Sequence, residues 1–182
     1  SFFCPHGAIR PFFLDDVEQK NAPKGFQTIK AQGNEVKDGL YYRMQVSALD
    51  CMGCGNCADI CPSKENALQM KTYDEEIKEA ENWEYAMTLS NKNQNLKKDT
   101  VKGSQFVQPY FEFSGACAGC GETPYVKLIT QLFGDRMMIA NATGCSSIWG
   151  ASAPSMPYCK DENGRGPAWA NSLFEDNAEF GY

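Results

Sequence analysis

The sequence contains a single histidine, no long apolar run and no excess of positive charge. No apolar stretch approaches the ~20 residues that a helix needs to cross a bilayer. The first residues also lack the basic start and apolar stretch of a secretory signal. The formal net charge of -6 argues against nucleic-acid binding as the main task. We therefore expect a cytoplasmic protein that binds neither a membrane nor a nucleic acid.

Cysteine is the residue type that stands out, with 9 in 182 residues. The odd count and the long gap between Cys4 and Cys51 do not match a secreted disulfide framework. Thiols that are kept reduced and grouped at two-residue gaps are instead typical of metal ligands.

The segment from Cys51 to Pro62 has the pattern C-x2-C-x2-C-x3-C-P. Cysteines two residues apart on a tight loop can direct their sulfurs to three irons of one cube, and Gly53 and Gly55 let that loop wrap closely. The fourth cysteine, Cys61, points toward the other cluster of a two-cluster protein. A zinc ribbon needs a second C-x2-C about 15–20 residues away, and none lies there. The spacing predicts iron–sulfur ligation, with structural zinc as the alternative; the first three ligands are Cys51, Cys54 and Cys57.

In the first half of the chain, hydrophobic periodicity predicts a few short elements around this loop. Alternating polarity predicts a strand over 44–48 that enters the loop. Another short strand is predicted over 65–70. Residues 73–90 have the pattern of an amphipathic helix. The polar stretch over 91–99 lacks helical periodicity and predicts a linker over 91–104.

The second half opens with an aromatic-rich segment, 105–113, and a glycine-rich cysteine loop. Thr123 is expected to cap a helix that has Pro124 at its first position and ends at Gly134. The apolar face of that helix is expected to consist of Val126, Ile129, Leu132 and Phe133.

Residues 137–140 predict a buried strand, and the turn over 141–148 is expected to open another helix. A further short helix is expected over 171–178. Strand, helix and strand with glycines at the junctions are the pattern of an α/β domain that binds ligands at its loop ends. Trp83, Trp149 and Trp169 are predicted to be core or interface anchors.

A second group of cysteines lies in this half. Cys117 and Cys120 form a C-x2-C pair that fits zinc, a redox disulfide or a cluster. Cys145, in a Gly-Cys-Ser-Ser turn, would bring the number of ligands to three, one short of a cubane or a tetrahedral zinc site. Cys159 lacks flanking glycines and is predicted to be a thiol outside the site. Spacing alone leaves zinc and a cluster open here.

Cys4-Pro5 resembles the end of the first cysteine motif in bacterial two-cluster ferredoxin domains. The resemblance implies that Cys61 belongs to a second cluster. The alternative for Cys4 is a thiol without a ligand role. It also implies one [4Fe–4S] cluster on Cys4, Cys51, Cys54 and Cys57. The intervening segment is longer than in a minimal ferredoxin, and turn formers over 21–25 and 31–34 predict an inserted loop or hairpin.

Residues 111–150 and 163–181 resemble the thiamine-diphosphate domain of pyruvate:ferredoxin (flavodoxin) oxidoreductase. The matching stretches are FSGACAGCGETPY over 113–125, NATGCSS over 141–147 and GPAWANSLFEDNAEFG over 166–181. In that family a two-cluster ferredoxin domain precedes the thiamine domain, which is the order of the motifs here.

The resemblance implies that Cys117, Cys120 and Cys145 hold the cluster nearest the thiamine, with a fourth cysteine beyond residue 182. It also implies that Glu122 and the Cys145 turn line the thiamine pocket. The implied reaction is the oxidative decarboxylation of pyruvate with coenzyme A to acetyl-CoA, in a homodimer, with electrons passing through [4Fe–4S] clusters to ferredoxin or flavodoxin. The alternative is a non-catalytic ferredoxin-type electron carrier with a fused domain.

These inferences predict three regions. We expect a partial α+β ferredoxin-like two-cluster domain over 1–90, a linker over 91–104 and the first part of an α/β thiamine-diphosphate-binding domain over 105–182. The Gly-Asp-Gly type motif that holds magnesium and diphosphate in such domains is missing, because the nearest match reads Gly-Asp-Arg at 134–136. We therefore predict no catalytic residue, and we expect a segment of a longer enzyme that is not active alone.

Overall fold

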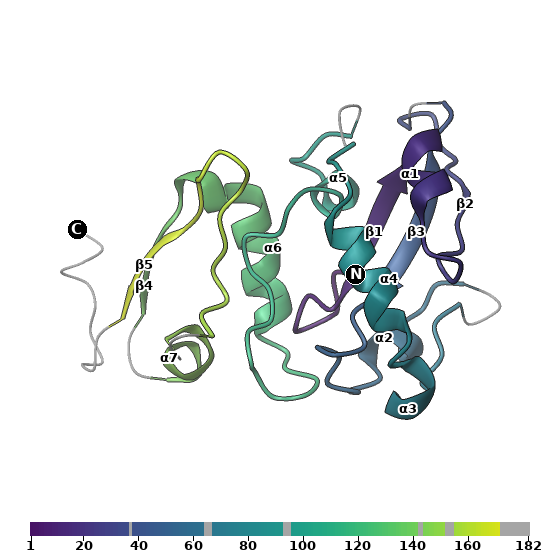
Figure 1. Ribbon diagram of the computed structural model, residues 1–182. Helices are drawn as coiled ribbons and strands as arrows, with labels where there is room; N and C mark the ends of the chain where they lie inside the picture. The colour runs from purple at the N-terminus through teal and green to yellow at the C-terminus, as the bar shows by residue number, and fades with distance from the viewer. Residues whose placement is uncertain (37, 64–66, 93–95, 142–143, 152–154, 172–182) are drawn as a thin grey trace. The chain divides into compact units, whose positions relative to one another are not determined.

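The computed structural model describes residues 1–36, 38–63, 67–92, 96–141, 144–151 and 155–171. The chain divides into two compact units, whose elements are shown in Figure 1. Unit 1 comprises Ser1 and Ala8–Gln108, and unit 2 comprises Phe2–Gly7 and Pro109–Tyr182. Within the described ranges, no helix has both the length and the apolar character needed to cross a bilayer.

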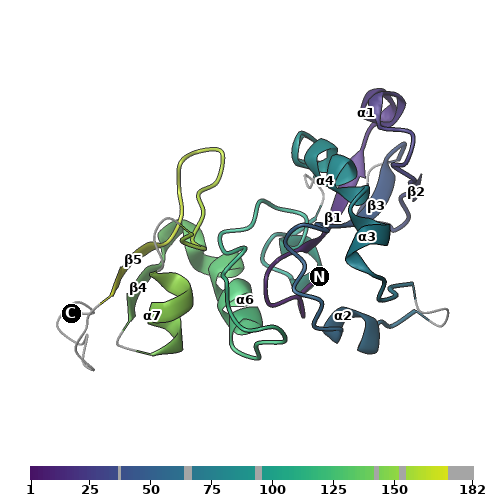
Figure 2. The same cartoon turned by 60° about the horizontal axis from the view of Figure 1, so that its bottom comes forward.

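Unit 1 is built on an antiparallel sheet with the strand order β1–β3–β2 (Figures 1 and 2). The strands are β1 (Ile9–Leu14), β2 (Ile29–Lys30) and β3 (Tyr41–Val46). Since Ile9 pairs with Val46, the end of β3 lies beside the start of β1. The strand predicted over 44–48 is confirmed, although it begins earlier and ends at Val46. The segment predicted to be an inserted loop or hairpin forms a helix, α1 (Asp16–Asn21), and the β2–β3 hairpin.

The described residues of unit 1 also form the short helices α2 (Asn56–Asp59), α3 (Tyr73–Glu76), α4 (Glu79–Met87) and α5 (Val101–Ser104). The helix predicted over 73–90 is therefore present as two helices with a break at 77–78. A capping box, in which Thr72 and Glu75 exchange hydrogen bonds, fixes the start of the first one. The strand predicted over 65–70 is wrong for residues 67–70, and its remaining positions lie outside the described residues.

The apolar core of unit 1 forms where α4 packs on the sheet, around buried Leu14, Phe26 and Ala86. Residues after α4 contribute to the same unit, because Leu96 is 7% exposed and the ring of Phe106 stacks at 4.3 Å on that of Phe13. Part of the segment predicted as a linker thus packs within unit 1. The division into 1–90, 91–104 and 105–182 stays a prediction.

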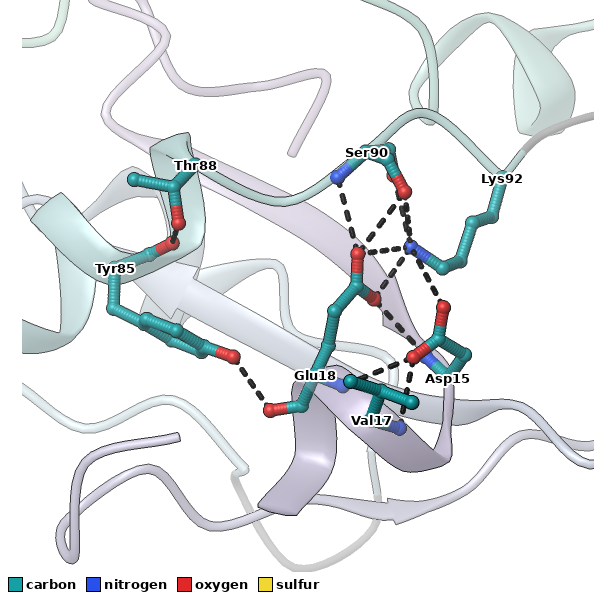
Figure 3. A network of polar contacts seen from close by, with 7 residues as sticks. All are labelled: Asp15, Val17, Glu18, Tyr85, Thr88, Ser90 and Lys92. Carbon is teal, nitrogen blue, oxygen red and sulfur yellow. Dashed lines mark hydrogen bonds and ion pairs between the residues drawn. The ribbon is translucent and has the colours of Figure 1, made fainter. Parts of the chain in front are cut away.

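An ion-pair network ties the end of α4 to α1 (Figure 3). Lys92 Nζ lies 2.5 Å from the Glu18 carboxylate and 3.9 Å from that of Asp15. Ser90 donates to the Glu18 carboxylate, and the Tyr85 hydroxyl donates to the Glu18 main-chain carbonyl. Burial raises the pKa of Glu18, but the hydrogen bonds from Lys92 and the other donors outweigh it and hold this pKa below its ordinary value. The chain leaving α4 is therefore bound to α1.

A second carboxylate, that of Glu79 on α4, joins this helix to the sheet. It accepts hydrogen bonds from Arg43 at 2.7 Å, Gln45 at 3.2 Å and Asn82 at 2.8 Å. Gln45 and Asn82 are buried, at 2% and 4% exposure. Burial raises the pKa of Glu79, but these donors and the charge of Arg43 hold it below its ordinary value.

Unit 2 contains a β–α–β arrangement. β4 (Met138–Asn141) and β5 (Ala168–Asn171) pair in parallel, with α7 (Cys145–Gly150) in the connection between them. Figure 2 shows α7 beside the strand pair. Parallel strands need such a crossover because a tight turn cannot join them. The longer helix α6 (Thr123–Phe133) precedes β4, with the short 3-10 turn Gly134–Arg136 between them.

Several predictions for unit 2 hold and others do not. The helix end at Gly134 and the helix that opens after Gly144 are confirmed. The predicted cap is wrong, because Thr123 is the first residue of α6 and Glu122 occupies the N-cap position without a capping hydrogen bond from its side chain. The strand expected over 137–140 is present as β4, yet its residues are exposed or partly exposed, so the predicted burial is wrong. β5 was not predicted. Of the helix expected over 171–178, the first residue ends β5 and the others lie outside the described residues.

The expected apolar face of α6 is only partly buried. Val126 packs against the core of unit 2, but Ile129 and Phe133 are 45% and 48% exposed. The buried side of the helix is polar instead and consists of Thr123, Lys127, Thr130 and Gln131. The hydroxyl of Thr130 donates to main-chain carbonyls one turn earlier, so this polar side chain is buried with its hydrogen bond made.

Replacing Glu79 by Gln is expected to lower the free energy of unfolding of unit 1 by about 1–3 kcal/mol at neutral pH, because its hydrogen bonds lose their charge. The pKa of folded Glu79 lies below the ordinary value of 4.5. The stabilisation is therefore complete above that value and is lost as the pH falls through the folded pKa. Denaturant unfolding at a series of pH values should show the difference between wild type and Glu79→Gln shrinking in acid.

Glu81→Gln is the matched control, because Glu81 lies exposed on the same helix. We expect it to change the free energy of unfolding by less than about 0.5 kcal/mol. An equal loss in both variants would show that the carboxylate of Glu79 does not anchor α4.

Candidate iron–sulfur centres

The connection from β3 to Cys51 is held by a buried serine, Ser47, which is 1% exposed. Its N–H donates to the carbonyl of Ala8 at 2.7 Å, and its hydroxyl donates to the carboxylate of Asp50 at 2.5 Å. The N–H of Cys51 donates back to the Ser47 carbonyl at 3.1 Å. The pairing of β1 with β3 therefore fixes where the first cysteine loop begins.

The loop that carries Cys54 and Cys57 turns through left-handed backbone at two glycines. The φ angle is +64° at Gly53 and +81° at Gly55, values that residues with a Cβ disfavour. No atom lies within 4 Å of the place that a Cβ would take at Gly53, so the backbone conformation itself requires glycine. Gly55 is also the residue before α2, which carries Cys57. The close turn that the sequence predicts at these glycines is present.

Cys61 follows α2, at the end of the motif. Main-chain N–H groups donate to its sulfur, that of Ser63 with the largest effect and those of Leu68 and Ala67 with smaller ones. These hydrogen bonds hold the pKa of the Cys61 thiol below its ordinary value. Because the thiolate is the form that binds metal, this environment suits a ligand.

Cys4 lies in the Phe2–Gly7 segment, which belongs to unit 2. This segment is joined to the stretch before the second cysteine loop, where the N–H of Phe113 donates to the His6 carbonyl at 2.8 Å. The cysteines over 51–61 belong to unit 1. The four-ligand set that combines Cys4 with them stays a prediction.

The second cysteine loop also contains left-handed backbone. The φ angle is +52° at Phe113, +65° at Gly115 and +73° at Gly119. Positive φ is uncommon for a residue other than glycine, so Phe113 marks a locally constrained backbone. Cys117 is exposed on this loop and Cys120 is half-buried at its end.

Hydrogen-bond donors gather on the sulfur of Cys120 at the start of α6. Burial raises the pKa of this thiol, but hydrogen bonds from the main-chain N–H groups of Thr123 and Glu122 outweigh it. The pKa of Cys120 therefore lies below its ordinary value. The N–H of Cys120 itself donates to the carbonyl of Cys117 at 3.0 Å, which closes the loop.

The two residues implied to line the thiamine pocket precede or begin helices. Glu122 is the residue before α6, and Cys145 is the first residue of α7 and is exposed. Trp149, further along α7, donates its Nε1–H to Glu122 Oε2 at 3.3 Å. A side chain from the Cys145 helix therefore reaches Glu122. Trp149 lies in the core of unit 2, which confirms the prediction of a core anchor for it.

Cys159 lies next to an isolated bridge between Phe111 and Tyr158. Its sulfur is 3.5 Å from Glu112 Oε1 and 3.4 Å from the carbonyl of Pro157. The thiol thus has hydrogen-bond acceptors of its own in unit 2. Its exclusion from the metal sites stays a prediction.

Within the described part of the chain, no three Cys, His, Asp or Glu side chains gather closely enough to hold a metal ion. The ligand sets therefore stay predictions. In their chemistry the residues fit an iron–sulfur cluster, because cysteine thiolates are the soft ligands that clusters take. None of the nine cysteines forms a disulfide, and main-chain donors lower the pKa of Cys61 and Cys120.

Sequence reasoning missed the contacts of three residues that lie near these cysteines in the sequence or in the fold. Ser47 anchors the first loop through Ala8 and Asp50, the main-chain N–H of Thr123 donates to the sulfur of Cys120, and the indole N–H of Trp149 donates to Glu122. Spacing and periodicity give no signal for the bonds that join Ser47 to Ala8 and Trp149 to Glu122, because only the fold brings these partners near.

Comparison with known proteins identifies the class of the first site. Residues 44–64 match the 4Fe-4S binding domain family. These residues include the four cysteines over 51–61, so the chain carries an iron–sulfur segment of the ferredoxin type, which agrees with the mixed α/β architecture of unit 1.

The whole chain also matches larger enzymes. It is 63% identical over 181 residues to the pyruvate-flavodoxin oxidoreductase of Enterobacter agglomerans. It is 61% identical over 184 residues to the pyruvate:ferredoxin oxidoreductase of Moorella thermoacetica. A third relative is the pyruvate dehydrogenase [NADP(+)] of Cryptosporidium parvum, at 59% over 182 residues. Each alignment covers 100% of this chain but only 15%, 16% and 9% of the relative. The chain is thus a homologue of one segment of the pyruvate:ferredoxin (flavodoxin) oxidoreductases.

Replacing Cys54 by Ser is expected to abolish the [4Fe–4S] signal that forms when the chain is reconstituted anaerobically with iron and sulfide. A serine oxygen is a harder ligand than a thiolate and leaves one iron poorly held. Visible absorption, iron and zinc analysis, and EPR after reduction with dithionite measure the result.

Cys159→Ser is the matched control and should keep the signal. Loss of a cluster in this variant would contradict the placement of Cys159 outside the sites. A colourless wild-type protein that carries only zinc would contradict the iron–sulfur assignment itself.

Proposed function

We propose that this chain is the part of a pyruvate oxidoreductase that carries electrons away from a thiamine-bound substrate through [4Fe–4S] clusters. The observation that carries the proposal is the identity of 63% over the whole chain to a pyruvate-flavodoxin oxidoreductase. The cysteine pattern over 51–61 supports it independently, because that spacing suits a cubane cluster. The proposed reaction of the complete protein is the conversion of pyruvate and coenzyme A to acetyl-CoA and carbon dioxide.

In this proposal the cysteines form two groups with different tasks. The first group holds the clusters of a two-cluster ferredoxin-like domain, with one complete set on Cys4, Cys51, Cys54 and Cys57 and with Cys61 as a ligand of the other cluster. The second group holds a cluster beside the thiamine, on Cys117, Cys120 and Cys145. The hydrogen bonds to the sulfurs of Cys61 and Cys120 favour their thiolate forms and would stabilise negative charge on the clusters. Bound clusters supply one-electron steps at low potential.

Unit 2 would form part of the thiamine-diphosphate site. Its parallel β4–β5 pair with α7 in the connection supports an α/β domain, in which ligands bind at loop ends. Glu122 directly precedes α6 and Cys145 begins α7, the two helices that would face the cofactor. Thiamine diphosphate, when bound with Mg²⁺, supplies the electron sink for decarboxylation. The residues of this chain would orient it and hold the adjacent cluster.

The electron acceptor is proposed to be ferredoxin or flavodoxin, in a homodimeric cytoplasmic enzyme. The relatives are named for flavodoxin, ferredoxin and NADP(+), although this segment is similar in all of them. We therefore propose no choice between ferredoxin and flavodoxin from this segment.

The alternative of a stand-alone electron carrier has weaker support. A ferredoxin-type carrier accounts for residues 44–64, whereas the relatives named above match the second half of the chain as well. Glu122 and the second cysteine group lie in that half.

The 182-residue chain by itself is expected not to reduce viologen dyes with pyruvate and coenzyme A. It has no Gly-Asp-Gly type motif for magnesium and diphosphate, and glycine loops or helix ends would have to replace a bound divalent ion. The same chain should still accept electrons from dithionite at its complete cluster. Anaerobic dye assays of the purified chain, beside a full-length protein containing it, measure both activities.

The full-length protein is the positive control and should reduce the dye in the same assay. Robust dye reduction by the 182-residue chain would contradict the assignment of the missing steps to other parts of the protein. A full-length protein that accepts electrons from dithionite but never from pyruvate would favour the electron-carrier alternative.

A further inference from the structure

Trp149 is the side chain through which α7 joins the core of unit 2. It is 4% exposed and packs with Phe111 and Ala116. Its ring meets that of Phe111 edge-on, with 5.2 Å between centroids, and lies 6.5 Å from the ring of Tyr158. A large ring enclosed on several sides has few alternative rotamers, so its packing fixes the position of α7.

The same ring makes a hydrogen bond that leads to the other cysteine loop. Its Nε1–H donates to Glu122 Oε2 at 3.3 Å. Trp149 lies about one helical turn beyond Cys145 on α7, and Glu122 lies two residues beyond Cys120. The bond therefore links the segment that carries Cys145 to the segment that carries Cys120, which are distant in the sequence.

The packing strengthens this link because the core around Trp149 is shared by both segments. Ala116 is buried in it beside Cys117, and Cys120 packs against it from the second loop. An indole is well suited to such a place, since it fills apolar space and carries a single N–H donor. A phenylalanine would keep most of the packing and lose only the donor.

We propose that Trp149 is a positioning residue that orients the carboxylate of Glu122 and fixes the segments of Cys120 and Cys145 relative to each other. The inference rests on the proposed function, under which Glu122 lines the thiamine pocket and the two cysteines hold the adjacent cluster. Trp149 acts through Glu122 and the cysteine segments.

Trp149→Phe in a full-length protein containing this chain tests the proposal. We expect unchanged iron and sulfide content, about 5–10-fold weaker binding of thiamine diphosphate, and an altered EPR spectrum and potential of the thiamine-proximal cluster, because one hydrogen bond to a carboxylate is lost. The EPR signals of the ferredoxin-like clusters should not change. Trp169→Phe is the matched control, since its ring lies 5.8 Å from that of Tyr158 in the same aromatic group. It should leave thiamine binding and the spectrum as in wild type.

Glu122→Ala removes the acceptor and leaves the indole in place. It should change the spectrum in the same way, and Trp149→Phe added to it should have no further effect on the spectrum. Additive changes, or a wild-type spectrum and wild-type thiamine binding in Trp149→Phe, would overturn the proposal.

If Trp149→Phe loses iron, its spectrum cannot be compared with that of wild type, and Glu122→Ala becomes the test. An unchanged EPR spectrum of the thiamine-proximal cluster in Glu122→Ala would then overturn the proposal. A wild-type protein that binds no thiamine diphosphate or shows no thiamine-proximal cluster would overturn the proposed function together with this inference. If wild type binds thiamine diphosphate and shows the thiamine-proximal cluster, but the variants leave thiamine binding and the EPR spectrum unchanged, only this inference is overturned.

Discussion

Each cysteine loop contains residues with positive φ angles, in the left-handed region of backbone conformation. The close turns that group the cysteines depend on these residues. Gly53 and Gly55 have such angles in unit 1, and Gly115 and Gly119 have them in unit 2. Glycine adopts such φ values without the cost that a Cβ adds, so the chain can double back within a few residues. A loop of this kind brings closely spaced cysteines and main-chain N–H groups to one place, which cluster ligation needs.

Loops of this kind hold their shape only when their ends are fixed. In unit 1 the fixed end is Ser47, which directly follows β3 and hydrogen-bonds to Ala8 and Asp50. Because β1 and β3 pair in a fixed register, these bonds fix where the loop begins. In unit 2 the fixed end is the start of α6, where the main-chain N–H of Thr123 donates to the sulfur of Cys120. One loop is thus held by a sheet and the other by a helix, although both place thiols in a hydrogen-bonded setting.

Two half-buried carboxylates, those of Glu79 and Glu18, hold α4 and the chain after it in unit 1. Glu79 collects donors from α4 and β3, and Glu18 collects them from the chain after α4. Such charge-assisted bonds favour one packing of α4 on the sheet, because an alternative packing would leave Arg43 or Lys92 without its carboxylate. The segment between β1 and β3, which includes Glu18, therefore helps to hold α4 and the chain after it in place.

The sequence by itself determined the features that depend on neighbouring residues. The spacing over Cys51–Cys61 gave the class of site, the glycines gave the tight turns, and Gly134 gave the end of α6, since each follows from local geometry. Only the tertiary structure decided which side of α6 is buried, that residues 168–171 pair with β4, and that Trp149 reaches Glu122. These features join residues far apart in the chain, and burial and pairing depend on the partner that folding supplies, which no local pattern records.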